Sequence, residues 1–344
     1  MEHDAYPPRR GRGPLLRRLA ARRGPVGLAL GGGGARGIAH CGVIEALADY
    51  PALYPRIYAG TSAGAVMAVL AAAGVAPEEI RTFSVELDWF KHIIRVSDMI
   101  DLRNGSRAGI FPNTRLAEVV QEYIGDVGFD DLPYDVAVTA TDIEHQRRVI
   151  MTSRRVAARI DRRELERFLQ PPRGELPGAD TLVLSDVSIG HAIRASSAVP
   201  GFFRPVRVGD MDLVDGGLVD QTPVDVVRAM GASFSIGVSL ALSFMPQKLA
   251  NAKQAFSGTM GMLGIQQLRK SLELADIGFQ VSGIAGRSPV KPHQIDLIDI
   301  GRADIETQIG RFFGARGAAR LRRSRRGASA GRRLTPGAQS VPSG

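Results

Sequence analysis

The chain has 344 residues, 44% of them hydrophobic and 23% charged, which is enough to bury a sizeable core in one large domain or two smaller ones. Its single cysteine, Cys41, excludes an intrachain disulfide and fits a reducing compartment. The net charge of +9 comes from the ends, because residues 1–24 carry +5, residues 311–344 carry +9 and residues 25–310 carry −5. This mildly acidic interior argues against nucleic-acid binding, and no apolar stretch is long enough for a membrane-spanning helix.

Both ends of the chain are predicted to be basic, disordered arms, at residues 1–24 and 322–344. The first arm places arginines between its apolar residues and lacks the unbroken apolar segment of a secretory signal. We therefore expect a cytoplasmic protein with a single domain over residues 25–321. Arginine-rich arms favour peripheral contact with an anionic membrane, and a purely solvated tail is the alternative. The sequence does not indicate an oligomeric state.

A buried strand is predicted at residues 26–30, and a glycine-rich loop at 31–37 leads from it into a helix. Such a loop points backbone N–H groups at whatever lies above the sheet. A P-loop is excluded because no Lys-Ser or Lys-Thr pair follows. The spacing of Gly32, Gly34 and Gly37 fits a dinucleotide fingerprint, but the acid expected at the end of the next strand is missing. The interpretation left is an oxyanion hole.

The nucleophile for such a site is predicted in the segment Gly60-Thr61-Ser62-Ala63-Gly64. It has the spacing G-x-S-x-G and lies between a short strand and an apolar helix, the context that defines a nucleophile elbow. Small neighbours allow the serine to occupy a tight turn, and the helix N-terminus favours negative charge beside it. The alternative is a plain glycine-rich turn in which Ser62 caps the helix.

The remaining elements are predicted from apolar periodicity and turn residues. Helices are expected at 77–124, with a break at 109–112, and at 187–197, 223–230, 244–285 and 305–321. Strands are expected at 134–142, 148–152 (as its hairpin partner), 206–208, 211–214, 234–240 and 294–300. The apolar cluster Trp89, Phe90, Ile93 and Ile94 is a candidate cap over the site. Residues 154–180 are interpreted as a solvated helix and a surface loop.

Asp215 follows the strand at 211–214 and precedes Gly216 and Gly217. An acid at a strand end, before two glycines, is placed on a loop above a sheet, where catalytic residues are common. The alternative is an ordinary turn aspartate. The small residues at 195–200 indicate a tight passage beside another element, and Ser196 and Ser197 are interpreted as packing around the site.

Four blocks thus follow one another: Gly32-Gly33-Gly34-Ala35-Arg36-Gly37, Gly60-Thr61-Ser62-Ala63-Gly64, Ala195-Ser196-Ser197-Ala198-Val199-Pro200 and Asp215-Gly216-Gly217. Together they resemble the bacterial patatin-like phospholipases, including the group related to neuropathy target esterase, over roughly residues 26–300. The resemblance implies an α/β protein with a three-layer α/β/α fold and a mostly parallel central sheet. It also implies a serine lipid acyl hydrolase that cleaves acyl esters of (lyso)phospholipids or related lipids.

The resemblance assigns Ser62 as nucleophile and Asp215 as general base, with no metal or other cofactor. It assigns to the oxyanion hole the residues Gly32, Gly33, Gly34, Arg36 and Gly37, and to the flanking motifs Gly60, Gly64, Gly216 and Gly217. The sequence departs from the family pattern at Gln221, where members often have asparagine, and in a longer loop around 154–184. The loop bears on substrate access, and neither departure touches the dyad.

Three other interpretations stay open from the sequence. An α/β-hydrolase with a Ser-His-Asp triad needs a histidine after the acid, and His293 is the one that follows Asp215. A patatin-like scaffold could bind lipid or a regulatory partner without turnover. Acyl transfer to an acceptor other than water uses the same residues as hydrolysis. The expected partner in each enzyme reading is a lipid substrate, and no nucleic acid is expected.

Overall fold

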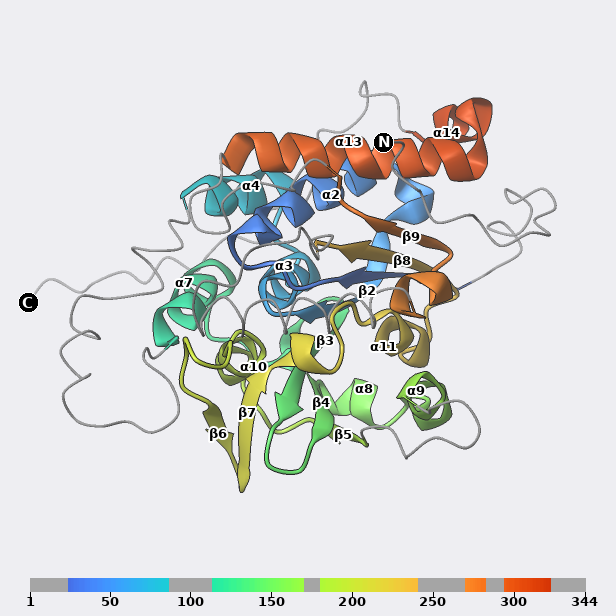
Figure 1. Ribbon diagram of the computed structural model, residues 1–344. Helices are drawn as coiled ribbons and strands as arrows, with labels where there is room; N and C mark the ends of the chain where they lie inside the picture. The colour runs from blue at the N-terminus through green and yellow to red at the C-terminus, as the bar shows by residue number, and fades with distance from the viewer. Residues whose placement is uncertain (1–23, 87–112, 170–179, 241–269, 283–293, 323–344) are drawn as a thin grey trace, which may run out of the picture.

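The computed structural model of the chain describes residues 24–86, 113–169, 180–240, 270–282 and 294–322 (Figure 1). The expected arms lie outside the described residues, apart from Gly24 and Arg322, where they join the domain. The apolar cluster at 89–94 and most of the region 244–285 also lie outside them.

The described strands form one nine-stranded sheet in which β5, β4, β3, β2, β1, β8 and β9 lie in that order, with β6 and β7 attached beside β3. Their bounds are β1 Val26–Leu30, β2 Pro55–Thr61, β3 Asp135–Asp142, β4 Arg147–Thr152, β5 Thr181–Leu184, β6 Val206–Val208, β7 Met211–Asp215, β8 Phe234–Ser239 and β9 Ile277–Gln280. Neighbours along the main order pair in parallel except β3 and β4, which form the expected antiparallel hairpin. The predicted mostly parallel sheet is confirmed.

Helices cover both faces of this sheet. The α-helices are α2 Ala39–Ala48, α3 Ala63–Ala72, α4 Pro77–Glu86, α7 Thr114–Ile124, α8 Arg154–Ala157, α9 Arg162–Leu169, α10 Ile189–Ser196, α11 Val224–Ala229, α13 Gln294–Phe313 and α14 Ala315–Leu321. Short 3-10 turns lie at η1 Gly34–Ile38, η2 Pro51–Leu53, η4 Phe129–Asp131 and η5 Gly216–Leu218. Figure 1 shows α2, α4 and α13 on one side of the sheet and α8, α9 and α11 on the other, which gives the expected α/β/α layers.

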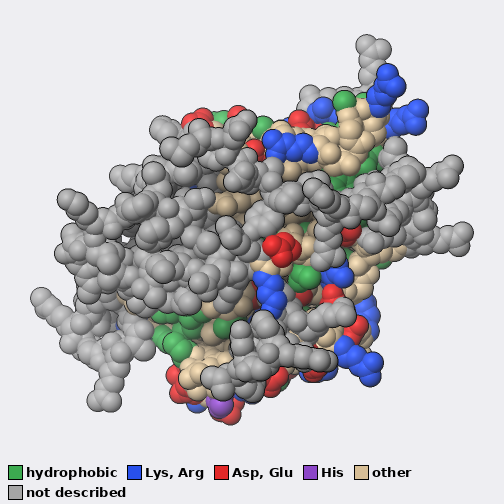
Figure 2. All heavy atoms as spheres, turned by 45° about the vertical axis from the view of Figure 1, so that its right-hand side comes forward, with side chains coloured by type: hydrophobic (Ala, Val, Ile, Leu, Met, Phe, Trp, Pro, Cys, Tyr) green, Lys and Arg blue, Asp and Glu red, His purple; other side chains and the backbone are tan. Residues whose placement is uncertain are grey.

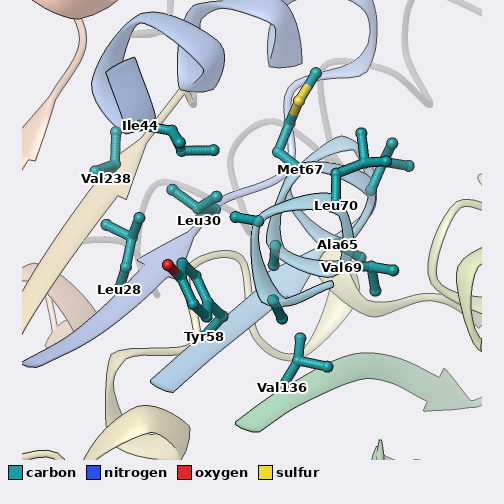
Figure 3. Close-up of a cluster of buried hydrophobic side chains, with 14 of the residues drawn as sticks. Leu28, Leu30, Ile44, Tyr58, Ala65, Met67, Val69, Leu70, Val136 and Val238 are labelled. Atoms are coloured by element: carbon teal, nitrogen blue, oxygen red, sulfur yellow. The ribbon is translucent and has the colours of Figure 1, made fainter. Parts of the chain in front are cut away.

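The core divides into two clusters because successive strand residues point to opposite faces. On β1, Leu28 and Leu30 belong to the cluster on the α2 and α3 side, whereas Ala29 belongs to the one on the α9 and α11 side. Figure 3 shows the first cluster, where these leucines and Tyr58 of β2 lie beside α3. Every residue of α3 is buried, so the helix that follows the elbow is held between sheet and outer helices.

Two sequence predictions are wrong in the C-terminal third. The region 244–285, expected to be helical, contains strand β9, which pairs in parallel with β8. The strand expected at 294–300 is the first part of the 20-residue helix α13. That helix packs on α2 through glycine, because a Cβ at Gly301 would lie 2.0 Å from the carbonyl oxygen of Ala39. Strand β5 at the other edge was not anticipated. None of the helices in the described ranges is long and apolar enough to span a membrane.

Candidate active site

The elbow is a left-handed turn at the end of β2. Ser62 has φ = 55°, a value that non-glycine residues adopt only where the surroundings enforce it. A Cβ at Gly60 would lie 2.4 Å from the Gly64 carbonyl oxygen, and one at Gly64 would lie 2.1 Å from the Leu30 carbonyl oxygen. Both flanking positions of the predicted motif are therefore restricted to glycine by contact with backbone.

Strand β7 brings Asp215 to the elbow from the opposite direction. β2 ends with Thr61 beside Thr139 of β3, and β7 ends with Asp215 beside Ala140, the next residue of β3. Since β4 occupies the other edge of β3 over this stretch, β7 continues the line of β2 beyond its end. Two strands of opposite direction thus deliver Ser62 and Asp215 to one point above the sheet.

The carboxyl group of Asp215 is buried and hydrogen-bonded. The residue is 8% exposed, and its Oδ1 accepts the Gly217 N–H at 2.8 Å. Burial raises the pKa of Asp215 to about 6, while hydrogen bonds from Gly217 N–H and from the Ser62 side chain lower it. A carboxylate with this pKa is ionised at neutral pH and is a stronger base than an ordinary aspartate.

The backbone of Ser62 is held by the third sequence block. Its N–H donates to the hydroxyl of Ser196, at the end of α10, over 2.8 Å. Ser196 is fully buried, and Ser197 is 8% exposed. The sequence predicts that both serines pack around the site. Ser196 also has a specific polar role, because its hydroxyl oxygen accepts a hydrogen bond from the backbone N–H of Ser62 at the strained turn.

The glycine loop lies against the elbow. A Cβ at Gly32 would lie 3.3 Å from the Ser62 Cβ, and one at Gly37 would lie 2.4 Å from the Ala63 Cβ. The Gly32 N–H donates to the Gln221 carbonyl at 3.1 Å. That donor is engaged within the protein, whereas no described residue accepts a hydrogen bond from the N–H of Gly33 or Gly34. Of the three glycines Gly32, Gly33 and Gly34 predicted to supply oxyanion donors, Gly33 and Gly34 therefore have N–H groups available to a ligand.

Arg36 turns back onto the loop that contains it. Its Nε donates to the Gly33 carbonyl at 3.2 Å, and its Nη1 is buried without a hydrogen-bond partner among the described residues. Burial lowers the pKa of the guanidinium, which nevertheless stays charged at any physiological pH. An unpaired cation beside the loop N–H groups favours a negative charge at this position.

Beneath the elbow lies a buried ion network that sequence analysis missed. Nη1 of Arg148, on β4, donates to Asp220 at 2.7 Å and to Asp225 at 2.8 Å, and all three side chains are at most 1% exposed. The pKa of both carboxyls is raised above its ordinary value, because the effect of burial outweighs the lowering effect of Arg148. The Thr61 hydroxyl donates to the Asp220 carbonyl at 2.8 Å, which joins the network to the residue before the nucleophile.

The histidines that the structure describes have partners away from the Ser62 hydroxyl. His40 Nε2 lies 2.8 Å from the Gly31 carbonyl, His145 Nδ1 lies 2.8 Å from Asp142, and His191 Nδ1 lies 2.9 Å from Ser188. His293 is outside the described residues. Within the described ranges no group of three or more histidine, cysteine or acidic side chains is arranged to hold a metal ion.

Comparison with known proteins identifies the family to which the chain belongs. A model of the patatin-like phospholipase family matches residues 28–228, which include the glycine loop, the elbow and Asp215. The chain therefore belongs to the patatin-like phospholipase family, as its four sequence blocks predicted.

Relatives of the chain include uncharacterized proteins of the NTE family. One from Mycobacterium tuberculosis is 29% identical over 238 residues, covering 69% of this chain and 34% of the relative. Another, from Mycobacterium bovis, is 32% identical over 224 residues, covering 62% of this chain and 49% of the relative. The chain thus matches between a third and a half of these relatives' lengths. Among solved structures, VipD from Legionella pneumophila is similar at a TM-score of 0.45 and 15% identity, covering 83% of this chain and 66% of that one.

Proposed function

We propose that the protein is a serine lipid acyl hydrolase that cleaves acyl esters of (lyso)phospholipids or related lipids through a Ser62–Asp215 dyad. The observation that carries the proposal is the meeting of a left-handed Ser62 with a buried, ionisable Asp215 at the end of β7. Membership of the patatin-like phospholipase family supports the same reaction class.

In the proposed reaction, Asp215 accepts the Ser62 proton while the serine oxygen attacks the ester carbonyl carbon. The carbonyl oxygen becomes an oxyanion beside the N–H groups of Gly33 and Gly34, with the Arg36 charge nearby. Collapse of this intermediate expels the alcohol, which takes the proton from Asp215 and leaves an acyl-enzyme. Water then attacks the acyl carbon while Asp215 accepts its proton. Asp215 returns this proton to the Ser62 oxygen as the bond to the acyl carbon breaks, which releases the fatty acid and restores both residues.

The catalytic assignment is tested with Ser62→Ala and Asp215→Asn, and with Ser282→Ala as a control on a serine that bonds to the surface residue Asp304. Ser62→Ala should reduce esterase activity by about 10⁴-fold or more and abolish fluorophosphonate labelling. Asp215→Asn removes the base and should slow both by about 10²–10⁴-fold. Activity of wild-type protein should fall as the pH drops through about 6, because Asp215 becomes protonated.

Substrate class is identified by incubating wild-type protein with phospholipids, lysophospholipids and neutral acylglycerols, and by mass spectrometry of the products. Fatty acid release at near wild-type rate by Ser62→Ala would reject the nucleophile. Wild-type protein that neither labels nor hydrolyses any of these lipids would favour a lipid-binding scaffold. Labelling that depends on a histidine such as His293 rather than on Asp215, in matched substitutions, would favour the Ser-His-Asp triad.

We also propose that the Arg-rich arms bring the domain to anionic membranes. Basic side chains of the described residues gather at the upper right of Figure 2. Arg311 of α13 and Arg316 and Arg320 of α14, which precede the C-terminal arm, are exposed. Each basic side chain near an anionic surface contributes about 1 kcal/mol of binding. Deletion of residues 1–23 and 323–344 should reduce flotation with anionic vesicles and leave turnover of soluble short-chain esters unchanged. An equal loss of vesicle binding and of short-chain ester turnover would mean that the arms support the fold.

A further inference from the structure

Three consecutive carbonyls of the glycine loop are each held by a side chain from a different place in the chain. His40 Nε2, on α2, lies 2.8 Å from the Gly31 oxygen. Gln221 Nε2, after η5, donates to the Gly32 oxygen at 2.9 Å. Arg36 Nε donates to the Gly33 oxygen at 3.2 Å. We call these three hydrogen bonds the carbonyl clamp.

A clamp on a carbonyl also sets the direction of the next N–H. The C=O of one residue and the N–H of the following residue belong to one planar, trans peptide unit and point in opposite directions. The bond from Gln221 to the Gly32 oxygen therefore orients the Gly33 N–H. In the same way, the bond from Arg36 to the Gly33 oxygen orients the Gly34 N–H. Neither of these two N–H groups has a hydrogen-bond partner among the described residues.

Glycine makes such a clamp necessary. A glycine loop has no Cβ atoms to restrict rotation of its peptide units, and a Cβ at Gly34 would meet nothing within 4 Å. Gly34 is therefore not held by close packing, although Gly33 beside it packs against Leu240, where a Cβ would lie 2.8 Å from the leucine Cβ. The N–H groups are useful for catalysis only if they already point at the developing oxyanion, since turning them during the reaction costs free energy.

Gln221 is attached to the loop from both of its polar ends. Its backbone carbonyl accepts the Gly32 N–H at 3.1 Å, while its side-chain amide donates to the Gly32 oxygen. The neighbouring Gly217 leaves room for this amide, because a Cβ there would lie 2.6 Å from Gln221 Oε1. The Gly32 carbonyl can only accept, which assigns the NH₂ end of the amide to the loop.

We propose that Gln221 is a positioning residue that orients the Gly33 N–H toward the oxyanion through the peptide unit shared with Gly32. This inference rests on the proposed hydrolase function and extends it to a residue that does not touch the reacting atoms. His40 and Arg36 hold the neighbouring peptide units, and Gln221 can be changed without altering the loop itself.

The test compares Gln221→Ala and Gln221→Glu with the matched control Gln121→Ala. Gln121 lies on the exposed face of α7, and its side-chain amide donates to Asp126, which follows that helix. Rates are expressed per active site, counted by fluorophosphonate titration. Gln221→Ala should lower kcat by about 10–10²-fold, less than complete loss of a donor, with KM within about twofold and an unchanged melting temperature. The rate constant of labelling should fall in parallel, because the phosphonyl oxygen occupies the same position as the oxyanion.

Gln221→Glu adds a pH readout that a purely structural role would not move. An ionised glutamate cannot donate to the Gly32 oxygen, whereas a protonated one can. The ratio of the Gln221→Glu rate to the Gln221→Ala rate should therefore rise as the pH falls. Gln221 Oε1 and Asp215 Oδ1 both lie beside Gly217, so an ionised glutamate in place of Gln221 raises the pKa of Asp215. The ratio is therefore compared after the Asp215 titration of each variant has been fitted from its own pH profile.

The inference is overturned if Gln221→Ala has the same kcat per active site as the wild type. This includes the case in which fewer molecules of the variant are active but each active molecule turns over at the normal rate. An inactive, unlabelled wild-type protein would instead reject the proposed function. Whether Gln221 holds the loop is then tested by hydrogen exchange of the peptide covering residues 31–38, which should be faster in Gln221→Ala than in Gln121→Ala. Equal exchange in the two variants would show that Gln221 does not hold the loop.

Discussion

Two glycine turns meet at the site, one after β1 and one after β2, and they are held in shape by different forces. At the elbow, any Cβ on Gly60 or Gly64 would collide with backbone atoms at 2.4 Å or less. In the glycine loop, Gly34 has φ = 58° and open space around it, and side-chain hydrogen bonds hold the neighbouring carbonyls. Glycine is thus favoured at Gly34 by its backbone conformation, and at Gly60 and Gly64 by contact with neighbouring backbone.

The difference matches the task of each turn. The elbow must keep one hydroxyl in a strained position, and close packing resists displacement in every direction. In the proposed reaction Gly33 and Gly34 present their N–H groups to a ligand, so these two peptide units can be held only through their carbonyls. The elbow should therefore respond to changes in volume, and these two peptide units to changes in hydrogen bonding.

The largest effect is expected for Gly64→Ala. The new Cβ would lie 2.1 Å from the Leu30 carbonyl oxygen, which is part of the central strand and cannot move aside. We expect a loss of about 4–5 kcal/mol in the free energy of unfolding, measured by urea denaturation. Gly310→Ala is the control, since this helical glycine has nothing within 4 Å, and it should gain about 0.5–1 kcal/mol. Similar stability of the two variants would refute a steric lock at the elbow.

The ion network beneath the elbow is expected to give the next largest effect. Arg148→Met leaves the buried Asp220 and Asp225 without their cation, which should cost about 3 kcal/mol or more. The elbow would be affected as well, since Thr61 bonds to the Asp220 backbone. Urea denaturation gives the loss, and Arg154→Met, which breaks an ion pair at an 80% exposed arginine, is the control. A loss no greater than that of Arg154→Met would contradict the assigned burial.

Lowering the pH should weaken the loop without acting on the steric contacts of the elbow. Burial lowers the pKa of His40 to about 4, below its ordinary value of 6.5. Between these values the unfolded chain binds a proton that the folded chain does not, so stability falls as the pH falls from about 6.5 toward 4. The contribution should be about 2 kcal/mol between pH 7 and pH 5.

His40→Gln removes this titration while keeping a hydrogen-bond donor at the position. Denaturation curves at pH 7 and pH 5 should therefore show a smaller loss for His40→Gln than for the wild type. Taking the difference between the two proteins cancels Asp215 and the other carboxyls. Equal pH dependence in both would mean that His40 is not held neutral in the folded state.

The smallest effect is expected for Gly34→Ala. The added methyl group meets nothing within 4 Å, so the cost is limited to placing alanine at φ = 58°, about 1 kcal/mol. Urea denaturation beside Gly64→Ala gives a direct comparison of the two turns. A loss as large as that of Gly64→Ala would show that the loop is also sterically locked.

Local patterns in the sequence were sufficient to predict the strands at the centre of the sheet. β1, β2, β3 and β8 are short buried runs bounded by turn residues, and glycine spacing marks both turns of the site. Asp215 was found in the same way, because a strand, an acid and two glycines follow directly in the chain.

The strand prediction at 294–300 is wrong because strand-like and helix-like periodicities of apolar residues compete in this segment. In residues 294–300, Gln-Ile-Asp-Leu-Ile-Asp-Ile, polar and apolar residues nearly alternate, which favours a strand over a short window. The buried positions Leu297, Gly301, Ile305 and Ile309 recur every four residues, and this helical repeat emerges only over the full length of α13.

Partnerships between distant residues were beyond sequence analysis. Arg148 and Asp225 are 77 positions apart, and Gln221 and Gly32 are 189 apart. No local pattern relates such residues, because their contact follows from the strand order of the sheet. The signal that could have drawn attention to them is the presence of charged residues within otherwise apolar segments, such as Arg148 in β4.

The antiparallel approach of β7 to β3 makes the active site a late product of folding. Ser62 and Ser196 are 134 positions apart, and Asp215 reaches the elbow only when β7 has paired with β3 in one register. A shift of one residue would turn the Asp215 side chain to the opposite face of the sheet. Contacts of such long sequence separation form slowly compared with helices. During refolding, fluorophosphonate labelling should therefore return after the far-ultraviolet circular dichroism signal, and the labelling rate would measure completion of the sheet.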